Sequence, residues 1–235
     1  VAVRRADGTV AVSVGDGESR RGVRIVDGDG RQLAVNDQCP GLHGETVVAD
    51  EVLVFGCENG ALEYSNGSFT KIDGPGEYGR LGTVKGHDDS PVALADLKID
   101  PDAELERPEQ FALVDTTTDQ LRVVQLPQGV SYSFRSLARG PQAEALVLGT
   151  DGNLYVVDPA TGNTVNTISV TGAWNEPEDW QDPRPTVFTR HDAVYVTDPA
   201  TRQIHLVDLA TGAVSTSVTL NQAPNELSGT VGHEH

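Results

Sequence analysis

The stretch Ala145-Leu-Val-Leu-Gly-Thr-Asp-Gly-Asn-Leu-Tyr-Val-Val-Asp-Pro-Ala-Thr-Gly-Asn-Thr-Val165 decides the fold. Apolar residues form short runs on both sides of an Asp-Gly turn and again after Asp-Pro-Ala-Thr-Gly, which predicts three strands joined by tight turns. The pattern returns in residues 193–220, where the turns are Asp198-Pro-Ala-Thr-Arg and Asp208-Leu-Ala-Thr-Gly. Asp158 and Asp208 close equivalent strands 50 residues apart. The chain therefore contains a repeated antiparallel unit.

Looser copies of this unit precede it, beginning near Val10, Val52 and Phe111. Five copies in 235 residues give about 47 residues each, and such a period is typical of the four-stranded antiparallel blades of a propeller. We therefore predict an all-β chain, a β-propeller with about five blades, in which residues 1–235 form a single domain. A β-sandwich is the alternative, but it gives no reason for the Asp-Pro-Ala-Thr-Gly turn to recur at the same phase.

The charge of the chain indicates which classes of molecule it can bind. The chain has 35 acidic and 17 basic side chains and a net charge of −18. Nucleic acids and anionic membrane surfaces attract clusters of Lys and Arg, so neither is expected as a partner. The longest apolar runs are only a few residues, as at Ala145 to Leu148, which predicts no membrane insertion. Cations are the favoured ligands of so acidic a chain.

The chain begins at Val1 and contains no methionine. This leads us to expect that a segment was removed before Val1. Removal of an initiator methionine alone is the alternative.

The only two cysteines, Cys39 and Cys57, are 18 residues apart. Between them, residues 46–55 read as two short strands with a turn at Asp50-Glu51, and such a hairpin brings its ends together. In an oxidising compartment the pair would form one disulfide, worth about 3 kcal/mol on the loop-entropy model. Two buried reduced thiols are the alternative. Two cysteines alone do not make a structural zinc site, which needs three or four Cys or His ligands.

The histidines carry the possible chemistry. His43 and His87 are 44 residues apart, one repeat, and each is followed two positions later by an acid, Glu45 and Asp89. We interpret both as preceding the innermost strand of successive blades, which would place them at the same loop position on the same face. The chain ends in a third copy of this pattern, His233-Glu-His235.

Such pairs suit a metal ion. In extended backbone, residues i and i+2 point the same way, so a His-x-His or His-x-acid pair offers two ligands. Imidazole and carboxylate suit Zn²⁺, and an imidazole of ordinary pKa, about 6.5, is neutral near pH 7. His191 reads as a surface turn residue and His205 as a packed strand residue. The candidate zinc ligands are therefore His43, His87, His233 and His235.

Two segments interrupt the repeat. Residues 98–110 contain two prolines and a cluster of acids, which indicates a solvated loop. Residues 171–185 hold both tryptophans and form a stiff connection that either covers a neighbouring blade or docks a partner. No Gly-x-Ser-x-Gly nucleophile elbow and no P-loop is present, so the sequence lacks these signatures of hydrolases and nucleotide-binding enzymes.

Four motifs in order resemble a known family: Cys39-Pro-Gly-Leu-His-Gly-Glu45, Phe55-Gly-Cys-Glu-Asn-Gly60, Lys85-Gly-His-Asp-Asp-Ser-Pro91 and the loop containing Trp174 and Trp180. They are similar to the AztD family of periplasmic or cell-surface zinc metallochaperones. The resemblance implies a β-propeller without enzymatic activity that binds zinc and hands it to the solute-binding protein of a zinc ABC importer. Carried over residue by residue, it implies His43 and His87 as ligands, with His233 and His235, and a carboxylate from Glu45, Asp88 or Asp89.

The resemblance also implies that this chain is one portion of a longer protein. Members of the family are longer, closer to seven or eight blades, and carry a His/Asp-rich segment near the N-terminus that has no counterpart here. This implies that the chain is a C-terminal portion whose ring is completed by an N-terminal fragment of the same protein. Two other functions stay open: a metal-dependent propeller hydrolase or lactonase, whose metal activates water, and a metal-free interaction propeller that binds partners through the tryptophan loop.

Overall fold

The computed structural model describes residues 1–17 and 19–229. The chain divides into two compact units: unit 1 comprises Val1–Glu106 and Gln110–Val124, and unit 2 comprises Arg107–Glu109 and the chain from Gln125 onward. The described residues form five four-stranded antiparallel sheets, and their one helical segment is a single 3-10 turn. The prediction of an all-β chain built from four-stranded antiparallel units is confirmed. The assignment of residues 1–235 to a single domain stays a prediction.

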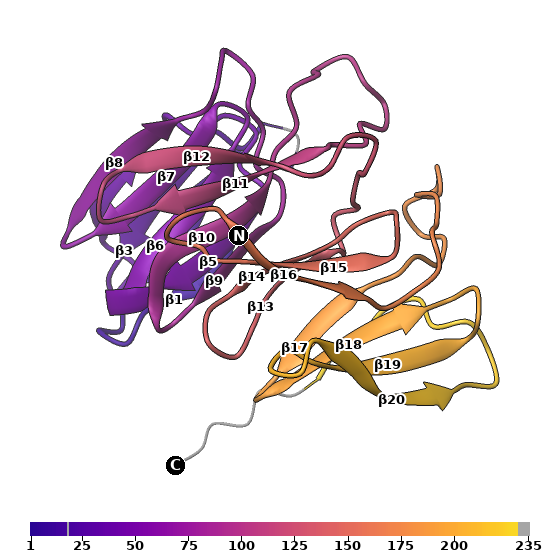
Figure 1. The fold of residues 1–235 in the computed structure, drawn as a ribbon. Helices are drawn as coiled ribbons and strands as arrows, with labels where there is room; N and C mark the ends of the chain where they lie inside the picture. The colour runs from indigo at the N-terminus through magenta and orange to yellow at the C-terminus, as the bar shows by residue number, and fades with distance from the viewer. Residues whose placement is uncertain (18, 230–235) are drawn as a thin grey trace. The chain divides into compact units, whose positions relative to one another are not determined.

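Unit 1 contains three sheets, each a meander in which consecutive strands pair (Figure 1). The first sheet consists of β1 (Ala2–Arg4), β2 (Val10–Val14), β3 (Gly22–Val26) and β4 (Gln32–Asn36). The second consists of β5 (Glu45–Val48), then the 3-10 turn η1 (Ala49–Glu51), β6 (Val52–Cys57), β7 (Gly60–Ser65) and β8 (Ser68–Asp73). The third consists of β9 (Val84–His87), β10 (Ser90–Asp96), β11 (Gln110–Asp115) and β12 (Gln120–Gln125).

Unit 2 contains two sheets with the same order of pairing, drawn from red to yellow in Figure 1. The fourth sheet consists of β13 (Leu137–Arg139), β14 (Ala145–Leu148), β15 (Asn153–Val157) and β16 (Thr164–Ser169). The fifth consists of β17 (Val187–Arg190), β18 (Ala193–Asp198), β19 (Gln203–Asp208) and β20 (Ala213–Thr219).

The repeated turn has the same local structure in the fourth and fifth sheets. Asp158 and Asp208 each accept a hydrogen bond from the backbone N–H two residues on, at 2.9 Å in both turns. Gly162 and Gly212 each donate their N–H to the carbonyl of that aspartate, at 2.8 and 2.9 Å. Both glycines have positive φ, 77° and 69°, which glycine adopts without steric cost. The sequence repeat is therefore a repeat of turn chemistry.

Alternating apolar residues form the cores within each unit. In unit 1, Val54 of β6 and Ala93 of β10 belong to one fully buried cluster, so the second and third sheets share a core. In unit 2, Leu146 of β14 and Val194 of β18 belong to one cluster shared by the fourth and fifth sheets. Burial of such apolar faces between neighbouring sheets is how blades stabilise one another.

The third sheet differs from its prediction. The sequence interpretation placed His87 before the innermost strand of its blade, but His87 is the last residue of β9, the first strand of this sheet, and residues 91–95 belong to β10. The sequence pattern did not predict β9, because Lys85 and Gly86 break the apolar alternation that indicates a strand. This shift of one strand changes the position of His87.

The two predicted loops lie between β10 and β11, where Gln110 alone belongs to a strand, and between β16 and β17. In the second loop, the Trp174 indole Nε1 donates to the carbonyl of Gly149 at 3.0 Å, whereas the Trp180 side chain is largely exposed. Trp174 therefore covers its own unit. Across residues 1–17 and 19–229, no helix has the length and apolar character needed to cross a bilayer.

Candidate functional site

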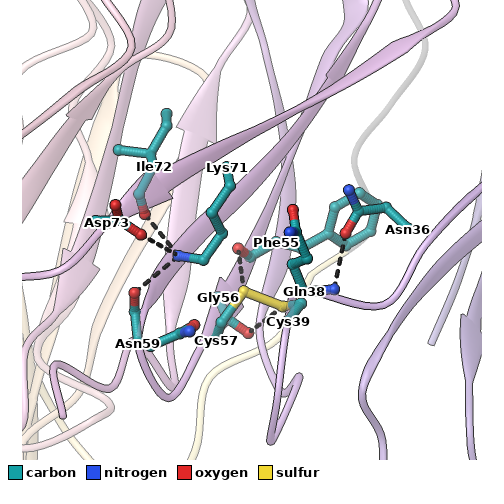
Figure 2. Close-up of a disulfide and its surroundings, with 10 residues drawn as sticks. All are labelled: Asn36, Gln38, Cys39, Phe55, Gly56, Cys57, Asn59, Lys71, Ile72 and Asp73. Carbon is teal, nitrogen blue, oxygen red and sulfur yellow. Dashed lines mark hydrogen bonds and ion pairs between the residues drawn. A yellow bond between two sulfur atoms is a disulfide. The ribbon is translucent and has the colours of Figure 1, made fainter. Parts of the chain in front are cut away.

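A disulfide fixes the loop that leads into β5. Cys39 and Cys57 are bonded, with their Cα atoms 4.9 Å apart, and both side chains are fully buried (Figure 2). The prediction of a disulfide is confirmed, because the β5–β6 hairpin brings the two ends together as expected. The bond attaches the start of residues 39–44 to the end of β6.

Backbone hydrogen bonds hold the same loop along its length. The N–H of Glu58 donates to the carbonyl of Pro40 at 2.8 Å, and the N–H of His43 donates to the carbonyl of Gly56 at 3.2 Å. The N–H of Gly56 in turn donates to the carbonyl of Gly44 at 2.8 Å. The backbone at His43 is thus an extension of the β5–β6 ladder, and the position of its Cα is set by the second sheet.

Lys71 lies in the same region (Figure 2). Its ammonium donates to the carbonyls of Asn59 and Ile72, at 2.8 and 2.9 Å, and lies 3.6 Å from the Asp73 carboxylate. Burial lowers the pKa of Lys71 from its ordinary value, partly offset by Asp73. Lys71 therefore connects the end of β8 to the residue that precedes β7.

The imidazole of His43 is oriented by the third sheet. Its Nδ1 lies 2.8 Å from the carbonyl oxygen of Gly82. Because a carbonyl oxygen can only accept, Nδ1 carries the proton of the neutral ring, and Nε2 keeps its lone pair. His43 is exposed. A ring held at Nδ1–H by a carbonyl, with a free Nε2, is the usual arrangement of a histidine that binds a metal ion.

The Gly82 turn is bound to a buried carboxylate. The N–H groups of Gly82 and Thr83 donate to Oδ1 of Asp96, at 2.6 and 2.7 Å. The Asp96 side chain is almost fully buried. Burial raises the pKa of Asp96, while the two N–H donors and the charges of Lys98 and Arg80 act to lower it. Asp96 is thus the polar anchor of the turn that contacts His43.

His87 has the opposite hydrogen bonding. It is the last residue of β9 and pairs with Ser90 across a tight turn. The N–H of Asp89 donates to His87 Nδ1 at 3.1 Å, so this nitrogen uses its lone pair within the turn, and Nε2 carries the proton of the neutral ring. The Asp89 carboxylate lies 3.9 Å from the same nitrogen. In this conformation neither ring nitrogen of His87 is free to bind a metal ion.

The strands β5 and β9 lie side by side and run in the same direction. His43, just before β5, contacts Gly82, just before β9, and further along the N–H of Gly86 donates to Oγ1 of Thr46 at 2.7 Å. His43 therefore lies at one end of this strand pair and His87 at the other, about five residues or about 16 Å further along. The prediction that the two histidines occupy the same loop position is wrong, because His87 is the last residue of a first strand and His43 precedes one.

The structure places His43 and His87 at opposite ends of β5 and β9. Joint binding of one zinc ion by the two imidazoles stays a prediction. Within residues 1–17 and 19–229, no group of three or more His, Cys, Asp or Glu side chains has an arrangement that could hold a metal ion. His233 and His235 lie outside the described residues, and their role as ligands stays a prediction.

The other two histidines match their predictions. His191 is exposed, in the turn between β17 and β18, with a φ of 50°. His205 lies in β19 and is almost fully buried, with Nδ1 2.8 Å from the Ser217 hydroxyl.

Comparison with known proteins supports the fold and the resemblance. No family model matches the chain. The chain is 26% identical, over 96% of its length, to the protein named zinc chaperone AztD from Citrobacter koseri, of which it spans 54%. The crystal structure of Citrobacter koseri AztD matches all of this chain and 63% of its own, with a TM-score of 0.77 at 24% identity. The WD40 domain of Neurospora crassa Pan2 matches 93% of this chain and 64% of its own, with a TM-score of 0.54 at 12% identity.

These likenesses confirm the β-propeller fold class and the resemblance to AztD indicated by the sequence motifs. The chain spans about half the length of the curated relative that it matches.

Proposed function

We propose that this chain is the zinc-binding propeller portion of a zinc chaperone, which passes the ion to the solute-binding protein of a zinc ABC importer. The likeness to the protein named zinc chaperone AztD, which covers 96% of the chain, carries this proposal. A chaperone of this kind is not an enzyme: its zinc is cargo, and its chemistry is the exchange of ligands.

His43 is the residue that we propose meets the zinc ion. Its ring is exposed, its proton is assigned to Nδ1 by the Gly82 carbonyl, and its Nε2 lone pair is free. A ligand oriented in this way loses little rotational freedom on binding and does not have to release a proton first. Glu45, exposed and two residues further on, is the nearest acid in sequence and the proposed source of a carboxylate ligand.

The remaining ligands in this proposal are His233 and His235. Zinc prefers four ligands in a tetrahedral arrangement, and an open position is filled by water or by an incoming group. A site built from one strand-end imidazole and a chain terminus can release its ligands one at a time, while ligands of the recipient protein replace them. Zinc would then move between proteins without becoming free.

The charge and the disulfide fit this function. A net charge of −18 raises the local concentration of divalent cations, an effect that weakens as salt rises. A buried disulfide is typical of oxidising compartments. We therefore propose a periplasmic or cell-surface location.

Zinc titration of the intact 235-residue chain tests the proposal, with a chromophoric chelator as competitor. We expect tight binding by the wild type and a loss of at least about tenfold in affinity for His43→Ala. His191→Ala is the matched control, since it also removes an exposed imidazole but lies in a turn of unit 2.

Three outcomes would contradict the proposal at different points. A wild type that binds no zinc would refute zinc binding itself. Equal losses for His43→Ala and His191→Ala would refute the assignment of His43. The third outcome concerns the rate at which zinc leaves the loaded protein. If a zinc-free solute-binding protein takes up the ion no faster than a chelator alone removes it, the chaperone function is refuted.

A further inference from the structure

The hydrogen bonds of one peptide group link Asp96 to His43. The peptide between Gly82 and Thr83 donates its N–H, from Thr83, to Asp96 Oδ1 at 2.7 Å. The carbonyl of the same peptide, from Gly82, accepts the Nδ1–H of His43 at 2.8 Å. The order of groups is therefore carboxyl, amide and imidazole, and it runs from β10 of the third sheet to His43, two residues before β5 of the second sheet.

A second set of bonds holds this peptide in place. The N–H of Gly82 also donates to Asp96 Oδ1, at 2.6 Å, and the N–H of Asp96 donates to the carbonyl of Thr83 at 3.1 Å. Three hydrogen bonds thus join Asp96 to the turn of Gly82 and Thr83. They fix the direction of the Gly82 carbonyl, which in turn fixes the plane and the tautomer of the His43 ring.

We propose that Asp96 is a positioning residue for zinc binding at His43, and that it acts through the Gly82–Thr83 peptide. This inference rests on the function proposed above. In many metal sites a carboxylate binds the second nitrogen of the ligating histidine directly and strengthens the ligand. In this chain an amide lies between the two groups. Because hydrogen bonds in a chain polarise one another, an acceptor at the amide N–H makes its carbonyl a stronger acceptor for His43.

The burial of Asp96 is matched by its hydrogen bonds to the residues that contact His43. Its carboxyl is almost fully buried, a position that usually excludes acids unless they are paired or hydrogen-bonded. Its Oδ1 accepts hydrogen bonds from the two N–H groups of the turn that contacts His43. An apolar residue at this position would leave those two donors without the carboxyl oxygen that they share, and the turn would be free to reorient.

The test compares Asp96→Asn with Glu63→Gln in the full chain. Asparagine has the same shape, and its Oδ1 can still accept, but neutral hydrogen bonds are about half as strong as charge-assisted ones. Glu63 is as buried as Asp96, with 3% of each residue exposed, and it lies on β7, away from the hydrogen bonds that join Asp96, Gly82 and His43. Glu63→Gln therefore controls for the removal of a buried acid.

Two quantities are measured for each variant: zinc affinity, by competition titration, and the tautomer of His43, by nitrogen NMR of ¹⁵N-histidine-labelled protein at a pH where imidazoles are neutral. We expect Asp96→Asn to weaken zinc binding about tenfold and to shift the His43 signals from the Nδ1–H form towards a mixture of tautomers. We expect Glu63→Gln to change neither quantity. A purely structural defect would not move the tautomer in a protein that keeps its fold.

The outcomes separate this inference from the proposed function. Zinc binding that depends on His43 but is unchanged in Asp96→Asn overturns the role of Asp96 alone. Absence of zinc binding in the wild type overturns the proposed function, and the role of Asp96 in zinc binding with it. The wild-type spectrum is a further test that needs no variant to fold: if His43 carries its proton on Nε2, the link through Gly82 is refuted.

Discussion

His43 and His87 look alike in the sequence and differ in the structure. They are 44 residues apart, and an acid follows each two positions later. The Nδ1 of His43 donates to a carbonyl 39 residues away in another sheet, whereas the Nδ1 of His87 accepts from an N–H two residues away in its own turn. The long-range contact leaves a lone pair free for a ligand, and the local one consumes it. A histidine motif therefore predicts a metal ligand only when the partner of its second nitrogen is known.

Removal of the disulfide should have the largest effect of the changes considered, because the disulfide fixes the loop that carries His43. In a Cys39→Ser, Cys57→Ser double variant we expect a loss of about 3 kcal/mol in the free energy of unfolding, because the unfolded chain gains freedom. Zinc affinity should fall as well, since residues 39–44 lose one of their attachments. Urea unfolding and zinc titration measure the two effects. An unchanged urea midpoint would show that the hydrogen bonds of the loop suffice without the disulfide.

Gly86→Ala should cost about 2 kcal/mol, within the usual range for overpacking. A Cβ on Gly86 would lie 1.9 Å from the carbonyl oxygen of Val47, so β9 would have to move away from β5. Thermal or urea unfolding measures the loss. Gly28→Ala is the control, because no atom lies within 4 Å of its added Cβ. Equal stability of the two variants would contradict the close packing that places His43 and His87 at opposite ends.

Glu63→Gln should stabilise the protein at neutral pH, since it removes the cost of burying an ionised carboxylate. Burial raises the pKa of Glu63 above its ordinary 4.5, so its protonated form favours folding. That contribution is fully present below about pH 4.5 and is lost as the pH rises through the raised pKa. Urea midpoints at pH 4 and pH 8 test this: the gain should appear at pH 8 only. A gain of equal size at both values would assign the effect to packing.

His87→Ala should have the smallest effect, about 0.5 kcal/mol, from the loss of one partly exposed hydrogen bond. Zinc affinity should not change, in contrast to His43→Ala. The same titration and urea unfolding give both values. A tenfold loss of zinc affinity in His87→Ala would contradict the contrast between His43 and His87. It would require the turn at Asp89 to open and release the imidazole of His87.

Much of the fold could be predicted from turn chemistry. The turns predicted to start at Asp198 and Asp208 follow β18 (Ala193–Asp198) and β19 (Gln203–Asp208) in the structure. This succeeded because the aspartate that ends each strand also binds the N–H groups of the next turn, as Asp198 does with Ala200 and Asp208 with Ala210. Such bonds span a few residues and leave a local trace in the sequence.

The candidate site was only partly predictable. His43 and the disulfide were found, because the β5–β6 hairpin is local. Gly82 and Asp96 were missed: a carbonyl carries no side-chain signal, and an aspartate at the end of an apolar run, such as Val92 to Asp96, resembles the start of any turn. The order of β9 and β10 in their sheet would not have revealed the contact between Gly82 and His43, because that contact depends on how β9 aligns with β5 of a separate sheet.

The sequence by itself determined the four-stranded repeat, the cysteine pair and the acidic charge, because alternation, turn residues and composition act over short distances along the chain. Only the tertiary structure decided which histidine has a free nitrogen. That depends on the alignment of β5 with β9, which are strands of separate sheets joined by side-chain and glycine packing, with Gly86 against Val47. Packing between sheets sets this alignment with a precision of one residue, and no local pattern encodes it.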